Sequence, residues 1–181
     1  MAATRSTDRP RVGVSSCLLG EAVRFDGGHK RNTVLTEVLG PLVEWVPVCP
    51  EVEMGLGTPR DTLRLDRSGG DLRMVVPKTG RDHTHAMRDF AARRVLELAT
   101  RGLSGYVFKA NSPSCGVEHV LVYTEGGTPE RTGRGLFAEE LIRQNPLLPV
   151  EEEGRLSDAR IRDDFIERVF AYRDRKGLGG R

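Results

Sequence analysis

Short apolar runs alternate along the chain with longer stretches whose apolar residues recur at helical spacing. The short runs are bounded by glycine, proline or small polar residues, which is typical of strands. They lie at 11–16, 42–48, 63–65, 72–76, 105–110 and 147–150, and the pair 63–65 and 72–76 predicts a hairpin. The run Val120–Tyr123 fits either a strand or the start of a buried helix, because its period does not separate the two.

Helical spacing predicts a short helix after Asn32 and three longer ones, at 83–100, at 136–144 and from Ser157 to Arg175. The helix at 83–100 contains several i, i+4 apolar pairs, which is typical of an amphipathic helix. Glycine-rich segments at 49–60 and 125–135 predict irregular loops.

Strands that alternate with helices predict an α/β fold, here a single domain with a mainly parallel central sheet flanked by helices. The length of 181 residues is enough for one such core. We expect a domain over 11–150, followed at 151–181 by an amphipathic helix and a glycine-rich tail. In sheets of this kind, ligands bind outside the carboxyl ends of the strands.

Composition and charge argue against a general nucleic-acid binder, a membrane protein and a secreted protein. The formal net charge is only +2, whereas a general nucleic-acid binder is usually more basic. No apolar run approaches the roughly 20 residues that span a bilayer, so no membrane partner is expected. Residues 1–10 are polar and lack the apolar core of a secretion signal. An odd, widely spaced set of cysteines fits the reducing cytoplasm better than a secreted disulfide framework.

The chain has three cysteines, and each follows a predicted strand: Cys17, Cys49 and Cys115. Because parallel strands end at the same edge of a sheet, we expect the three thiols along one rim. On composition alone, scattered cysteines are more often buried packing residues. These three occupy turns instead of alternating core positions, which favours a functional role.

Thiolates bind iron–sulfur clusters, zinc and Cu(I). Structural zinc sites usually contain a local C-x₂-C pair, and the chain has none. A [4Fe–4S] cluster usually takes four cysteines, so three would leave one iron open to a substrate atom. The three cysteines therefore indicate a cluster site at the carboxyl ends of the strands.

Three sequence motifs resemble the thiouracil desulfidase (TudS) family over about Val12 to Gln144. They are Ser-x-Cys-Leu-x-Gly with Arg-Phe-Asp-Gly, Cys-Pro-Glu with Gly-Leu-x-x-Pro-Arg, and Lys-Ala-x-Ser-Pro-Ser-Cys-Gly. The resemblance implies a [4Fe–4S] cluster held by Cys17, Cys49 and Cys115, with one open iron that takes the substrate sulfur. It also implies non-redox desulfuration of a thiolated pyrimidine, of the 2-thiouracil or thiouridine type, to the oxo form with release of sulfide.

Such chemistry needs a proton-transfer group and hydroxyl donors near the metal. Glu51, two residues after Cys49, is the preferred catalytic carboxylate. Glu53 is the alternative and is otherwise expected to bind substrate. Ser112 is the preferred catalytic hydroxyl, and Ser114 is expected to bind substrate.

Three cations, Arg24, Arg60 and Lys109, are candidates to offset the negative charge of a cluster, with ordinary surface roles as the alternative.

The segment from Gly154 to Phe170 resembles the junction in two-domain relatives that are implicated in desulfurising thiolated uridine in tRNA. An ordinary helix packed on the sheet is the favoured interpretation of this segment. The near-neutral charge favours a small thiolated pyrimidine as the substrate over a tRNA position. The oligomeric state is not predicted.

Two other functions remain open at this point. A non-catalytic iron–sulfur or zinc protein, acting as a redox sensor or sulfur carrier, would bind metal without turning over a thiocarbonyl compound. An α/β binding module with buried cysteines would bind no metal at all.

Overall fold

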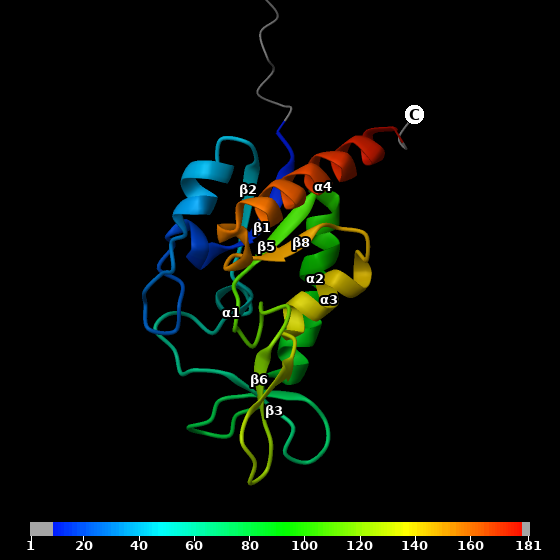
Figure 1. Ribbon diagram of the computed structural model, residues 1–181. Helices are drawn as coiled ribbons and strands as arrows, with labels where there is room; N and C mark the ends of the chain where they lie inside the picture. The colour runs from blue at the N-terminus through cyan, green and yellow to red at the C-terminus, as the bar shows by residue number, and fades with distance from the viewer. Residues whose placement is uncertain (1–8, 179–181) are drawn as a thin grey trace, which may run out of the picture.

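The computed structural model describes residues 9–178, so most of the expected polar lead and part of the glycine-rich tail lie outside the described residues. The first sheet contains four parallel strands in the order β2-β1-β5-β8. Their bounds are β1 Arg11–Ser15, β2 Glu44–Val48, β5 Gly105–Phe108 and β8 Val150–Glu152. With helices on both of its faces, this sheet confirms the predicted α/β fold (Figure 1).

A second four-stranded sheet, which the sequence did not predict as a separate layer, has the order β4-β3-β6-β7. Its strands are β3 Arg64–Asp66, β4 Arg73–Val75, β6 Val120–Tyr123 and β7 Glu130–Gly133. The predicted hairpin is the antiparallel pair β3–β4, and the ambiguous run at 120–123 is a strand. The expected loop at 125–135 is wrong in part, because β7 lies within it and pairs with β6.

The helices cover the first sheet from two sides. They are α2 Thr84–Thr100, α3 Leu136–Gln144 and α4 Ala159–Leu178, together with the π-helix η2 Val34–Leu39. Shorter turns are η1 Ser16–Leu19, α1 Pro50–Glu53 and η3 Arg155–Ser157. Figure 1 shows α4 at one end of the molecule and the strands β3 and β6 at the other.

Strand alternation divides the core into two clusters. Val12 and Val14 of β1 pack with η2 and α4, whereas Tyr106 and Phe108 of β5 face α2 and α3. Between the two valines, Gly13 is required, because a Cβ there would lie 2.2 Å from the Tyr106 ring.

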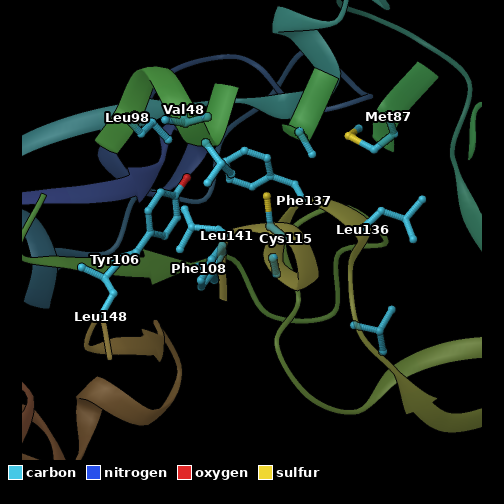
Figure 2. Packing of buried hydrophobic residues seen from close by; sticks show 14 of the residues in the cluster. Val48, Met87, Leu98, Tyr106, Phe108, Cys115, Leu136, Phe137, Leu141 and Leu148 are labelled. Atoms are coloured by element: carbon cyan, nitrogen blue, oxygen red, sulfur yellow. The ribbon is translucent and has the colours of Figure 1, made fainter. Parts of the chain in front are cut away.

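Cys115 lies beside Phe137 among the side chains of the second cluster (Figure 2). The rings of Tyr106 and Phe108 lie 4.2 Å apart between centroids, and Phe137 packs beside them. Cys115 itself is buried in this cluster with 5% exposure. The same packing that holds the two sheets to α2 and α3 therefore holds the third cysteine.

The C-terminal helix α4 packs on the first sheet. Phe165 and Val169 of α4 are fully buried in the cluster that contains Val12, Val14 and Val107. The close approach needs Gly105, since a Cβ at that position would lie 2.7 Å from Val169. Among the described helices, none is both long and apolar enough to cross a bilayer.

Candidate functional site

The three cysteines come to one place because their strands are neighbours. Cys17 lies in η1, directly after β1, and Cys49 stands between β2 and α1. Cys115 follows β5 through the turn 109–115. Since β2, β1 and β5 are adjacent and parallel, these segments leave the same edge of the sheet. The three free thiols line one cavity of about 350 Å³.

Burial raises the pKa of all three thiols, that of Cys17 to about 11 and that of Cys115 to about 12, and it raises that of Cys49 as well. A charge on Cys49 would raise the pKa of both other thiols further, which is expected of groups that face one another. Without a metal the thiols are therefore protonated at neutral pH. Binding a metal must displace these protons.

The donor set fits a soft metal centre. Within residues 9–178, no group of three or more His, Cys, Asp or Glu side chains is arranged to hold a single metal ion. Three thiols around a common cavity are nevertheless suitable donors for an iron–sulfur cluster, whose several irons are bound by separate thiolates.

The turn that carries Cys115 is fixed by hydrogen bonds. The Ser112 hydroxyl oxygen accepts the backbone N–H of Ser114 at 3.2 Å and that of Cys115 at 3.1 Å. The Ser114 carbonyl in turn accepts the N–H groups of Phe137 and Ala138 in the first turn of α3. Ser112 therefore serves the turn with its oxygen, as a serine commonly does.

Glu51 is bound through both of its carboxylate oxygens. Oε1 accepts the Ser114 hydroxyl at 2.8 Å, and Oε2 accepts Nε of Arg60 at 2.8 Å. The hydroxyl oxygens of Ser114 and Ser112 are 3.0 Å apart. When Ser114 donates its one proton to Glu51, Ser112 must donate to Ser114, which gives a directed chain from Ser112 to Glu51.

Arg60 ties the carboxylate to the wall of the cavity. Its Nη1 donates to the carbonyl oxygens of Val23 and Gly57, both at 2.9 Å, and its backbone N–H donates to Phe25. The Arg60 side chain is only 9% exposed and Glu51 is 13% exposed. The ion pair is therefore an internal part of the site instead of a surface contact.

Glu53 does not face the cavity. Its Oε1 accepts the backbone N–H of Cys49 at 3.1 Å, and its Oε2 accepts Nε of Arg94 at 2.8 Å. It is not among the residues that line the cavity, whereas Glu51, Ser112 and Ser114 are. In this geometry Glu53 links α1 to Cys49 and to Arg94 of α2, and its expected contact with substrate stays a prediction.

Two contributing residues were not singled out from the sequence. Ser15, buried at the end of β1, accepts the N–H of Lys109 at 2.9 Å, and its side chain lowers the pKa of the Cys115 thiol against the larger effect of burial. Glu153, just after β8, binds the Lys109 ammonium at 2.6 Å. Ser15 belongs to the Ser-x-Cys motif and could have been noticed there. Glu153 has no comparable signal in the sequence.

The fold and the site together define an α/β protein whose parallel strands deliver three thiols, a carboxylate and two hydroxyls to one cavity. A family model described as 2-thiouracil desulfurase matches residues 12–153, and the chain belongs to this family. The resemblance seen in the three motifs is thereby confirmed.

Two similar proteins extend this result. The chain is 31% identical to the solved structure of the [4Fe–4S]-dependent thiouracil desulfidase TudS, with a TM-score of 0.65 over 82% of this chain and 94% of the other. It is also 29% identical over 136 residues to YbbK of Bacillus subtilis, an uncharacterized protein. This alignment covers 72% of this chain and 88% of YbbK.

Proposed function

We propose that the protein is an iron–sulfur-dependent desulfidase that converts a thiolated pyrimidine, of the 2-thiouracil or thiouridine type, to its oxo form. In the net reaction, water supplies the oxygen, the C=S group becomes C=O, and sulfide is released without net oxidation or reduction. The observation that carries the proposal is that Cys17, Cys49 and Cys115 share one cavity with the Glu51–Ser114 pair. Family membership and the similarity to TudS support it.

The three thiols are proposed as the ligands of a [4Fe–4S] cluster. When bound by three protein ligands, such a cluster supplies one iron with an open coordination position, a Lewis acid for the thiocarbonyl sulfur.

The protein must also move protons at the reacting carbon. Glu51 is the proposed acceptor of the proton from the attacking water, because its carboxylate lines the cavity and Arg60 holds it in place. Ser114 donates to Glu51 and links it to Ser112, so both hydroxyls can pass a proton between the carboxylate and the cavity. In this arrangement Ser114 makes the closer contact with the base, and Ser112 both orders the turn and extends the proton path.

The shape of the cavity fits a small substrate. The cavity, which would hold the cluster as well as the substrate, has a volume of about 350 Å³, near the lower end of the roughly 300–1,000 Å³ that small-molecule pockets occupy. Phe25 lines the cavity with 38% of its surface exposed, and Arg24 lies 5.4 Å from its ring centroid, so the rest of the exposed ring can contact a pyrimidine. We therefore favour a free base or nucleoside over a tRNA position.

Anaerobic purification, followed by iron and sulfide analysis and an assay with 2-thiouracil and 4-thiouridine, tests the proposal. The expected result is a brown protein that contains iron and releases sulfide together with the oxo product. A protein that binds no metal after anaerobic reconstitution would overturn it. A protein that holds a cluster and turns over neither compound would support the non-catalytic sensor or carrier instead.

A further inference from the structure

Lys109 and Glu153 form a nearly enclosed ion pair beside the three thiols. Lys109 lines the cavity at the end of β5, and its Nζ lies 2.6 Å from Oε1 of Glu153. The two side chains are only 18% and 12% exposed. Water therefore screens this pair less than it screens a surface pair.

Glu153 contacts both the Lys109 side chain and the backbone on either side of Lys109. Its second oxygen accepts the backbone N–H of Ala110 at 2.7 Å, and its own N–H donates to the Phe108 carbonyl, next to the β5–β8 ladder. Lys109 also donates from Nζ to the Ala110 carbonyl at 2.9 Å. The ammonium group thus has a defined place at the start of the turn that leads to Cys115.

Lys109 lines the same cavity as Cys17, Cys49 and Cys115, so its ammonium group is placed to act on a cluster that these thiols would hold. Arg24 is the weaker candidate for charge compensation, since it pairs with Asp26 at 3.8 Å and Asp26 is largely exposed. Arg60 is paired with Glu51, the proposed proton acceptor, so a change at Arg60 would alter turnover as well as charge.

We propose that Lys109 compensates the negative charge of the thiolate-bound cluster, and that Glu153 is a positioning residue that places this ammonium and limits its net field. This inference requires the cluster of the proposed function, but it does not require the desulfidase activity. In an enclosed ion pair, removing one partner leaves the charge of the other uncompensated. Removing Lys109 and removing Glu153 should therefore change the reduction potential of the cluster in opposite directions.

The test is the reduction potential of the cluster, measured by an anaerobic redox titration of the reconstituted protein. A nearby positive charge stabilises the reduced, more negative state of the cluster. Lys109→Met removes that charge, so the potential should become more negative. Glu153→Gln keeps the side-chain shape and an acceptor for the Ala110 N–H while leaving the ammonium unpaired, so the potential should become more positive. The double variant should lie between the two single variants.

Two further variants separate the electrostatic effect from loss of structure. Lys109→Arg keeps the charge and should leave the potential near that of the wild type. Glu151→Gln is the matched control, because Glu151 lies in β8, two residues before Glu153, and pairs with Arg155 at 2.8 Å, away from the cavity lining. Its potential should not change.

The inference would be overturned if Lys109→Met and Glu153→Gln shifted the reduction potential in the same direction. It would also be overturned if Lys109→Met lost its iron and Lys109→Arg lost it as well. These outcomes would indicate a purely structural pair. If the wild type binds no cluster, the proposed function and this inference both fail. If it binds a cluster but has no turnover, only the proposed activity fails, and opposite shifts would still support the inference.

Discussion

At the scale of single residues, the two glutamates after Cys49 have separate environments, although the sequence left them as alternatives. Glu51 contacts Ser114 and Arg60 in the cavity, whereas Glu53 contacts the Cys49 N–H and Arg94. We expect Glu51→Gln to keep the cluster and to lower kcat by about 10²–10⁴-fold, the usual contribution of a proton-transfer group. Steady-state sulfide release with parallel iron analysis measures both.

Glu53→Gln is the control for this prediction, since an amide oxygen can still accept a hydrogen bond from Cys49 or Arg94. We expect it to retain kcat and to lose about 1 kcal/mol of unfolding free energy. Loss of turnover in Glu53→Gln alone would contradict the assignment of Glu51.

The two serines of the Cys115 turn should respond differently to removal of their hydroxyls. Ser114→Ala deletes the donor to Glu51, so kcat should fall while iron content stays constant. Ser112→Ala leaves the N–H groups of Ser114 and Cys115 without their acceptor, which costs about 1–3 kcal/mol for a buried donor. Thermal stability and iron content should therefore fall first. The reverse pattern would show that Ser112 makes the closer catalytic contact.

At the scale of elements, the packing of α3 on the Cys115 turn depends on Gly135, the residue before the helix. A Cβ at Gly135 would lie 2.4 Å from the Ser114 carbonyl carbon and 2.6 Å from the Cys115 nitrogen, and backbone atoms cannot move aside easily. We expect Gly135→Ala to cost about 1–3 kcal/mol of stability by overpacking, and to lower iron content. Chemical denaturation and iron analysis measure the two effects.

Gly154→Ala is the matched control for Gly135→Ala, because a Cβ at Gly154 meets no atom within 4 Å and the backbone φ of −63° suits alanine. It should leave iron content unchanged. Equal losses in the two variants would contradict a specific contact between α3 and the turn.

The elements that the sequence predicted are those with a strong apolar pattern. The ends of β1, β2 and β5 follow directly from such runs, and with them the shared edge of the three cysteines. Strand β7 was missed because Glu130, Arg131 and Thr132 are all exposed and carry no alternation. Helix α1 was missed because four residues are too few to show a helical period, although proline at its first position is a favourable start.

At the scale of the whole molecule, the contacts that complete the site join distant segments. Glu51 meets Ser114 across 63 residues, and Lys109 meets Glu153 across 44. Motifs within a single segment predicted the residue types, including the three cysteines. Only the tertiary arrangement distinguishes Glu51 from Glu53 or brings Glu153 to Lys109, because neither depends on local spacing.

The C-terminal helix provides the last prediction, since the sequence placed a boundary at residue 150 and the structure packs α4 on the sheet. Phe165 is fully buried against residues of β1 and β5. Phe165→Ala should therefore cost about 3–5 kcal/mol, as expected for a buried aromatic residue. Glu167→Ala, on the exposed side of the same helix, should have little effect. If thermal unfolding shows the same small change for both, residues 151–181 contribute little to the core and the boundary at 150 would hold. A large loss for Phe165→Ala alone, with a single cooperative transition, would make α4 part of the domain that carries the site.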